Sequence, residues 1–306
     1  MVNITRVNLL SLAASIPYAT ELQAVVNGSV DHLSFISYNE SFVTDILGPN
    51  VSQQLVGNYQ DFQPFHEAGV YNIQTGKLYA TSNWQGSLDN PINVTAIDIH
   101  GNNSIQSLHF DKLAEANGGS TFYPVGTPFN SSEGQQIVFC DEGDFINPAQ
   151  LVLVDPSTNQ TRVLINNFLG RNFTSINDVK QHPITGDLWF TDVPYGYWQY
   201  FRPAPVIKNQ AYPVADDAIA PNGIEISPDF KHVYITDTAV HTFPNKDNLT
   251  MPSTIYRVLL GVFAVDGGAA NFAFVPGGMY VFNEHRLFKV TLQAEGREVK
   301  RDFGLY

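Results

Sequence analysis

The 306-residue sequence contains a single cysteine, Cys140, so no disulfide can form within the chain. Basic residues are also scarce, because 16 Lys and Arg stand against 29 Asp and Glu, giving a formal net charge of −13. Binding to nucleic-acid phosphates requires a basic surface, so this balance argues against a nucleic-acid partner. No apolar run is long enough to cross a bilayer, and we therefore expect no membrane-spanning helix.

Several catalytic motifs are absent as well. The chain has no Gly-rich phosphate loop, no Cys/His zinc spacing and no G-x-S-x-G nucleophile elbow. These absences argue against nucleotide-dependent enzymes and serine hydrolases.

The chain does contain core-forming residues and many glycosylation motifs. Its 43% hydrophobic and 12% aromatic content is typical of a folded protein rather than a disordered one. The single cysteine alone would favour the cytosol. Asn-x-Ser/Thr motifs, which mark surface loops of secreted proteins, are dense enough to favour a secreted, N-glycosylated protein without its signal peptide. They begin at Asn3, Asn27, Asn39, Asn50, Asn93, Asn102, Asn130, Asn159, Asn172 and Asn248.

One pattern recurs along the chain: a Gly- or Asp-containing turn, a short hydrophobic strand with an aromatic residue, then a small polar or acidic residue. Strand-turn units at intervals of 40 to 60 residues are typical of propeller blades. The only good helix candidate is 110–119, which ends in two glycines. We therefore predict an all-β propeller forming a single domain over 1–306, with strands of 1–60 closing the ring. The repeats centre on Tyr79, Phe139, Trp189, Tyr234 and Tyr280.

Polar residues stand just ahead of three of these predicted strands. They are His66 and Glu67 in "PFHEAGVYN", Asn177 and Asp178 in "SINDV", and Asn222 in "APNGIEISPDF". If the three strands converge on the propeller axis, they bring together carboxylate and amide oxygens, which are ligands suited to Ca²⁺ or a similar cation. Taken singly, each residue is equally consistent with an ordinary turn.

The longer segments containing these residues resemble the gluconolactonase and senescence-marker-protein family of six-bladed propellers, in its secreted fungal lactonase branch. The resemblance covers about 62–294 and is most specific in "SINDVKQHPITGDLWFTDVPYGYWQYFRP". It implies that Glu67, Asn177 and Asn222 line a central metal and substrate site.

The chain also departs from the family pattern. About one blade is missing after "STIYRV", together with the aspartate that the family uses as a metal ligand. Asp266, Asp178 or Glu142 could supply the lost charge. The loss of a carboxylate weakens a Ca²⁺ site, because hard cations depend on ligand charge.

The remaining candidates surround this predicted site. Glu67, Asn177 and Asp178 are candidate catalytic residues, and His66 beside them could act as a general base. Asp141 with Glu142 could form an acid–base pair. Read as a strand, "YGYWQYF" would direct Tyr195 and Tyr197 to one face and Trp198 and Tyr200 to the other. With Glu142 and Asn177, one set would then line the wall of a substrate pocket.

Three functions fit these features. The first is metal-assisted hydrolysis of a lactone or related cyclic ester. The second is a cofactor-free biosynthetic enzyme, such as a pericyclase (a hetero-Diels–Alderase among them) acting on a fungal metabolite. The third is a non-catalytic binding propeller. The two enzymatic hypotheses share a small, cyclic, partly apolar substrate, and only the first requires a cation.

Overall fold

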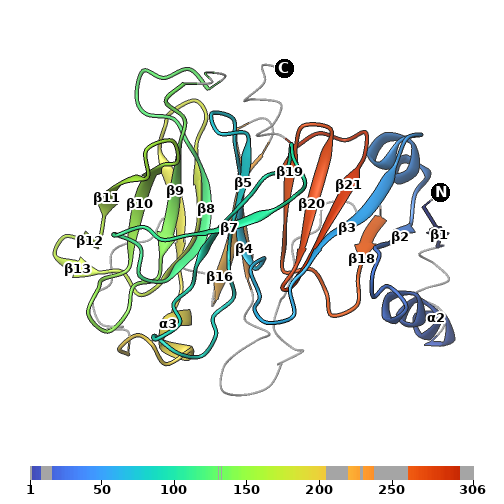
Figure 1. Ribbon diagram of the computed structural model, residues 1–306, viewed down its shortest axis with the longest axis horizontal. Helices are drawn as coiled ribbons and strands as arrows, with labels where there is room; N and C mark the ends of the chain where they lie inside the picture. The colour runs from blue at the N-terminus through green and yellow to red at the C-terminus, as the bar shows by residue number, and fades with distance from the viewer. Residues whose placement is uncertain are drawn as a thin grey trace. The chain divides into compact units, whose positions relative to one another are not determined.

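The alternating hydrophobic segments form antiparallel β-strands through most of the structure (Figure 1). The computed structural model describes residues 2–7, 16–129, 131, 133–204, 220–227, 230–237 and 261–296. No helix in these ranges is long and apolar enough to cross a membrane. The chain divides into unit 1, Met1–His66 with Tyr256–Tyr306, and unit 2, Glu67–Ile255. The single domain over 1–306 stays a prediction.

Unit 2 contains two four-stranded antiparallel sheets, in the orders β4-β5-β6-β7 and β11-β10-β9-β8. In both sheets, consecutive strands of the chain are neighbours, as in a propeller blade. The strands of the first sheet are β4 (Glu67–Asn72), β5 (Lys77–Thr81), β6 (Val94–Ile97) and β7 (Ile105–Leu108). Those of the second are β8 (Ala116–Phe122), β9 (Gln136–Asp141), β10 (Gln150–Asp155) and β11 (Gln160–Ile165).

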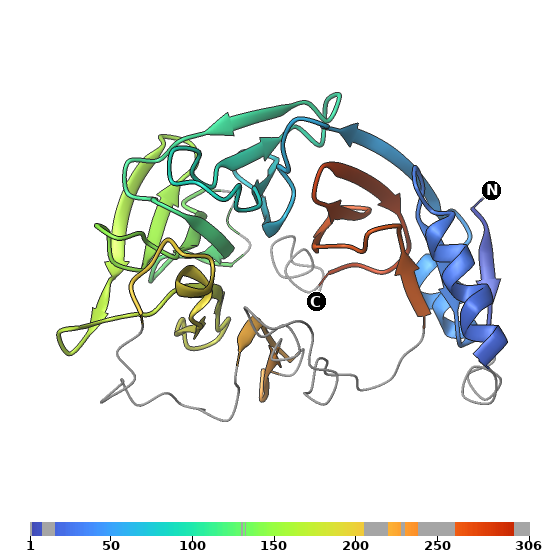
Figure 2. The same ribbon diagram turned by 90° about the horizontal axis from the view of Figure 1, so that it is seen from below.

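Shorter elements complete the described part of unit 2. They are three two-stranded antiparallel sheets and one helical turn, coloured from yellow-green to orange in Figure 2. The sheets are β12 (Asn167–Phe168) with β13 (Arg171–Asn172), β14 (Ile176–Gln181) with β15 (Leu188–Asp192), and β16 (Pro221–Ile226) with β17 (Val233–Asp237). The turn is α3 (Tyr195–Trp198).

Strands β9 and β10 are buried on both faces. Ile137 and Phe139 pack into one hydrophobic cluster, while Val138 and Cys140 pack into another. Successive side chains of a strand point to opposite faces, so a strand between two cores reads as a continuous hydrophobic run. This explains the uninterrupted sequence "IVFC" and gives the end of β9 a rigid position.

Unit 1 pairs N-terminal with C-terminal strands. Its four-stranded sheet has the order β19-β20-β21-β3, and its three-stranded sheet has the order β1-β2-β18. The rings of Phe35 and Phe42 each meet Phe263 edge to face in its core. Its elements are β1 (Ile4–Arg6), α2 (Ile16–Asn27), β2 (Ser34–Ser37), η1 (Phe42–Leu47, a π-helical turn), β3 (Ser52–Asn58), β18 (Gly261–Ala264), β19 (Asn271–Val275), β20 (Gly278–Asn283) and β21 (Arg286–Thr291).

The helix predicted over 110–119 is wrong. Residues 110–115 form turns and β8 begins at Ala116. A side chain at Gly118 would clash with the carbonyl oxygen of Asn177. The glycine therefore allows β8 to approach β14 closely, rather than ending a helix.

Most of the predicted glycosylation asparagines that are described lie on the surface. Asn3, Asn27, Asn39, Asn50, Asn102, Asn159 and Asn172 are exposed and Asn93 is half-buried, whereas Asn130 and Asn248 lie outside the described residues. Secretion and glycosylation stay predictions.

Candidate functional site

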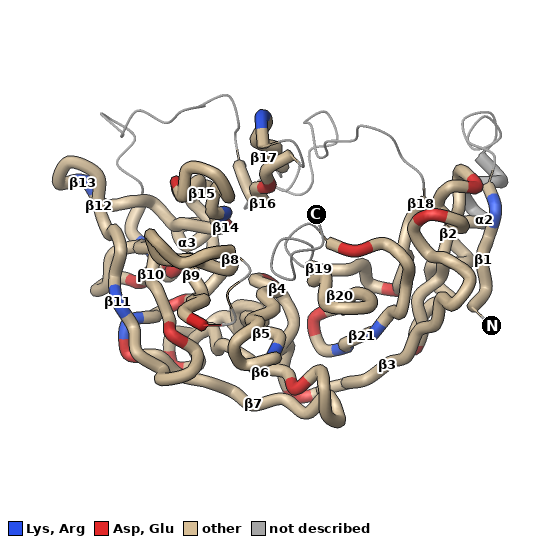
Figure 3. The backbone as a smooth tube through the Cα atoms, turned by 90° about the horizontal axis from the view of Figure 1, so that it is seen from above, with Lys and Arg blue, Asp and Glu red and all other residues tan. Residues whose placement is uncertain are grey.

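Four strands of unit 2 carry a polar residue at their first or second position. β4 begins at Glu67, and β8, β14 and β16 carry Asn117, Asn177 and Asn222 at their second positions. The strands contact one another in the order β4, β8, β14, β16 (Figure 3). The predicted residues Glu67, Asn177 and Asn222 therefore lie on neighbouring strands of one unit.

A β-bulge at the same place holds each asparagine. In β14 the ladder skips Asn177 and Asp178, which together lie opposite Thr191. The same shift follows Ala116 in β8 and Pro221 in β16. Bulges re-aim side chains and leave backbone groups outside the ladder, so three equivalent bulges can turn three amides toward one region.

Threonine hydroxyls satisfy the backbone N–H groups that two of the bulges release. The N–H of Asp178 donates to Thr191 Oγ1 at 3.1 Å, and the N–H of Gly223 donates to Thr236 Oγ1 at 2.8 Å. Thr191 Oγ1 then donates to the carbonyl oxygen of Asn222 at 2.6 Å. Thr191 therefore fixes the bulges of β14 and β16 to each other.

A relay of side-chain hydrogen bonds sets the direction of the Asn177 amide. The buried Glu142 carboxylate accepts from Asn117 Nδ2 and from Ser175 Oγ. Since a carboxylate only accepts, Asn117 must turn its amide nitrogen toward Glu142 and its oxygen away. Asn117 Oδ1 then accepts from Asn177 Nδ2 at 3.3 Å. The relay, Glu142–Asn117–Asn177, uses the amide nitrogen of Asn177 and leaves its amide oxygen outside these bonds.

Asn222 is oriented in a similar way from α3. Its Nδ2 donates to the hydroxyl oxygen of Tyr195 at 3.0 Å, which leaves its Oδ1 outside this bond. Tyr195, predicted as a substrate-binding aromatic, is therefore bonded to the predicted site.

Asp178 ties two inner strands together. Its carboxylate accepts the N–H of Ile224 at 3.0 Å and that of Val179 at 2.8 Å. Desolvation by burial raises the pKa of Asp178, while Lys180 and the two backbone donors lower it. This bonding fits a residue that holds β16 against β14, and its catalytic role stays a prediction.

Cys140, near the end of β9, lies within electrostatic range of three carboxylates. Burial raises the pKa of the Cys140 thiol, and the charges of Asp178, Glu142 and Glu67 raise it further. The hydroxyl of Thr81, which lies opposite Glu67, donates to the carbonyl oxygen of Asn117 at 3.0 Å. Both observations place Glu67 near the relay.

Asp141 and Asp192 play the same structural part in successive sheets. Asp141 accepts the N–H groups of Ala114 and Glu115, just before β8 begins. Asp192 accepts those of Thr174 and Ser175, just before β14 begins. Asp141 also accepts a hydrogen bond from Gln150 Nε2. These bonds fit a structural role for Asp141 better than a role as acid–base partner of Glu142.

Glu115 is a buried acid that the sequence analysis did not single out. Burial raises the pKa of Glu115 to about 8, a hydrogen bond from Ile92 lowers it, and repulsion from Glu142 raises it. The folded protein therefore holds a proton that the unfolded chain releases near the ordinary value of 4.5. Because the folded state binds more protons, this group makes stability fall as pH rises from about 4.5 to about 8.

Glu115→Gln should remove this dependence, because its amide needs no proton to be neutral. Above about pH 8 we expect the free energy of unfolding of the variant to exceed that of the wild type by on the order of a few kcal/mol, and near pH 4.5 we expect the two to match. Thermal melting across this range measures the difference, with the exposed Glu133→Gln as control. A difference of the same size at every pH would contradict the buried proton.

His66, predicted as a catalytic base, belongs to unit 1. Its Nδ1 pairs with Glu284 Oε1 at 2.9 Å, at the turn between β20 and β21. The structure gives His66 this carboxylate partner, and a role in catalysis stays a prediction.

The aromatic stretch after β15 forms a helical turn, so the strand predicted there is wrong. Gln199 N–H donates to the Tyr195 carbonyl, and the N–H groups of Phe201 and Arg202 both donate to the Gly196 carbonyl. Gly196 has no room for a side chain, because a Cβ would clash with Arg202. The alternation expected of a strand is lost, because the consecutive residues Trp198, Gln199, Tyr200 and Phe201 all line one cavity. Tyr197 lies outside that cavity and is exposed.

The donor set at the strand beginnings fits a hard divalent cation. Asn177 and Asn222 present amide oxygens, and Glu67 adds a carboxylate, which are donors that Ca²⁺ prefers. Among the residues that the structure describes, no three His, Cys, Asp or Glu side chains are placed to hold a metal ion. A cation here would therefore depend on the oriented amides.

The region of the expected missing blade, around "STIYRV" at 253–258, lies outside the described residues. Asp266, a candidate replacement ligand, belongs to unit 1, where its N–H donates to the Ser29 carbonyl.

Comparison with known proteins agrees with this architecture. The profile of the SMP-30/Gluconolactonase/LRE-like region matches residues 74–256. The lactonohydrolase oryL of Aspergillus oryzae is 32% identical over 68% of the chain and 48% of its own length. A gluconolactonase of Zymomonas mobilis is 28% identical over 45% of the chain and 42% of its own length. The chain thus spans about half the length of these relatives.

A solved gluconolactonase structure from Xanthomonas campestris shares the fold. It superposes with a TM-score of 0.57 at 16% identity, covering 86% of this chain and 97% of that one. The likeness confirms the predicted all-β propeller fold.

Proposed function

Because the chain belongs to the SMP-30/gluconolactonase/LRE-like family, we propose that it hydrolyses a lactone or related cyclic ester at the beginnings of β4, β8, β14 and β16. The observation that supports the proposal is the relay Glu142–Asn117–Asn177, which fixes the orientation of the Asn177 amide on a strand that lies in the same row as those of Glu67 and Asn222. Functional sites hold their side chains in fixed orientations through supporting hydrogen bonds, and we take the relay to be support of this kind for a bound ligand.

We propose that Glu67, Asn177 and Asn222 hold a divalent cation such as Ca²⁺. Bound there, the cation would polarise the lactone carbonyl. A carboxylate of this site, Glu67 or Asp178, would accept a proton from water as the water oxygen bonds to the carbonyl carbon. The ring C–O bond then breaks, and the leaving oxygen takes the proton to give the open-chain hydroxy acid.

Chelation separates this proposal from the alternatives. We expect about one equivalent of Ca²⁺ in the purified protein and a lower melting temperature after EDTA, because a ligand that binds only the folded state stabilises it. Metal analysis and melting measure both effects, and Ca²⁺ added back in excess of EDTA should restore the melting temperature. A metal-free protein that ignores both EDTA and Ca²⁺ would contradict metal-assisted hydrolysis.

The other two hypotheses predict different behaviour. A cofactor-free pericyclase would be indifferent to chelators and sensitive to substitution of its aromatic residues, and a binding propeller would turn over no cyclic ester. The relatives found here, which are named as lactone hydrolases, lend neither hypothesis support.

A further inference from the structure

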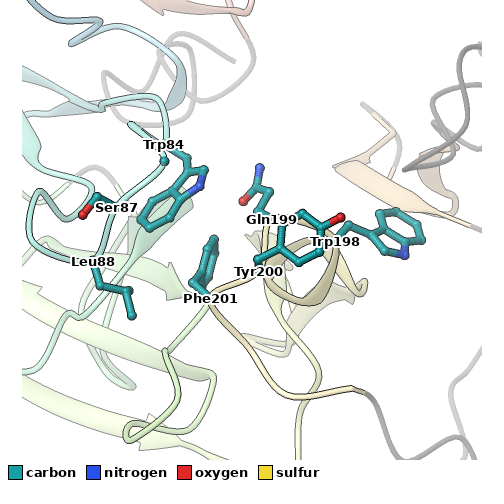
Figure 4. Close-up of a pocket in the computed structure, with 8 residues that line it drawn as sticks. Trp84, Ser87, Leu88, Trp198, Gln199, Tyr200 and Phe201 are labelled. Atoms are coloured by element: carbon teal, nitrogen blue, oxygen red, sulfur yellow. The ribbon is translucent and has the colours of Figure 1, made fainter.

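An aromatic cavity lies beside α3 in unit 2. It is an open cavity of about 510 Å³, lined by the segment just after β5 and by the end of α3 with the residues that follow (Figure 4). The rings of Trp84 and Phe201 lie 4.7 Å apart at 51°. Trp198, Tyr200 and Leu88 add further apolar surface, and none of the lining residues carries a charge. Such a lining favours a neutral, apolar group over a polyhydroxylated one.

Two features of the cavity are costly to the fold. Tyr200 is 72% exposed and has a φ of +65°, a left-handed conformation that is unfavourable for a bulky aromatic residue. The enclosed Oε1 of Gln199 has no hydrogen-bond partner among the described residues. Strained backbone and unpartnered polar atoms gather where a ligand binds.

The cavity is joined to the proposed site through α3. The first residue, Tyr195, accepts the hydrogen bond of Asn222, and the N–H of Gly196 donates to Ser175 Oγ at 3.1 Å. Ser175 in turn donates to Glu142, the start of the relay. The residues that line the cavity begin two positions later, at Trp198. One helical turn therefore fixes the distance between the amide oxygens and the aromatic wall.

We propose that this cavity binds the apolar substituent of the substrate, so that the enzyme acts on lactones carrying an alkyl or aryl side chain rather than on sugar lactones. This inference rests on the proposed lactone hydrolysis for the reacting half of the molecule. The ester ring would lie at the oriented amides, and the side chain would lie in the cavity against the exposed faces of Trp84 and Phe201, whose rings contact each other.

Tryptophan fluorescence tests the cavity without relying on turnover. Of the three tryptophans, Trp84 and Trp198 line the cavity, and Trp189 lies on β15 outside it. The probes are γ-lactams with side chains from methyl to hexyl, whose ring resists hydrolysis, and a polyhydroxylated sugar lactam. We expect the dissociation constant to fall about fourfold for each methylene buried, and the sugar lactam to bind weakest.

Substitutions of the lining residues test whether the lactam side chain binds in this cavity. Trp84→Ala should weaken binding of the hexyl lactam by about tenfold or more and flatten the dependence on chain length, while Trp198 still reports binding. Leu88→Ala, at an exposed position, is a milder change that should lower the affinity for the hexyl lactam about fourfold or more. Trp189→Phe is the matched control and should leave the chain-length dependence unchanged. Melting curves check that each variant is folded.

The outcomes separate the two proposals. A dissociation constant in the wild type that does not change with chain length would overturn the cavity inference, even if lactones are hydrolysed. Chain-length dependence that survives Trp84→Ala and Leu88→Ala would place the side chain elsewhere and also overturn it. Chain-length dependence that is lost in these variants supports the cavity, and if no lactone is hydrolysed only the proposed reaction falls.

Discussion

Glu67→Gln is expected to lower kcat/KM for lactone hydrolysis by roughly a thousandfold, the scale seen when one charge-stabilising group is lost from an active site. Glu67 is the only carboxylate in the proposed ligand set with Asn177 and Asn222. Glutamine keeps its shape and removes its charge, and the affinity of a site for Ca²⁺ depends strongly on ligand charge. Kinetics on a panel of lactones and calorimetric titration with Ca²⁺ measure the two losses.

The fold should survive this substitution. The backbone at Glu67 pairs with Thr81, and the following Ala68 and Gly69 have φ values of +65° and +77° that do not depend on the carboxylate. We expect the apo protein to melt within a few degrees of wild type. Glu225→Gln, on strand β16 of the same unit but exposed, is the matched control. If the Glu67→Gln variant kept wild-type activity and Ca²⁺ affinity, the reaction would have to take place at another site.

The fold could be predicted because its signal is local. The five repeats recognised in the sequence place Tyr79, Phe139, Trp189, Tyr234 and Tyr280 in β5, β9, β15, β17 and β20. Each of these strands is the second of its sheet, so a turn precedes it and a polar residue ends it every time. Three of the four polar residues near the strand beginnings, Glu67, Asn177 and Asn222, could be predicted from the same local pattern.

The rest depends on contacts between distant parts of the chain. Asn117 was missed because "ANGG" resembles the end of a helix, whereas Gly118 allows the close approach of β14, sixty residues later. The turn at Tyr195 was missed because alternating aromatics resemble a strand, and only the packing of Gly196 against Arg202 decides otherwise. Trp84 gave no signal, since nothing local shows that it meets Phe201.

The fixed direction of the hydrogen bonds in the relay predicts a second large loss of activity. Glu142→Gln replaces a group that only accepts by one that can also donate, so Asn117 can present either end of its amide to residue 142. Asn177 then loses its fixed orientation, and its amide oxygen no longer always faces the ligand. Changes in partners that orient a ligand residue cost about 10- to 100-fold, and we expect a loss of this size in both kcat/KM and Ca²⁺ affinity.

A second substitution can distinguish the lost orientation of the Asn177 amide from the simple loss of a buried charge. With Asn117→Asp added to Glu142→Gln, the new glutamine amide can donate to the aspartate, whose other oxygen again accepts from Asn177 Nδ2. Ser175 can still donate to the glutamine oxygen, so every bond of the relay is remade with Asn177 in its original direction. The double variant should therefore recover about tenfold over Glu142→Gln alone, and its effect should be far from the sum of the two single effects. Additive losses in kcat/KM and Ca²⁺ affinity would mean that Glu142 acts through its charge, and the relay would then no longer explain how Asn177 is aimed.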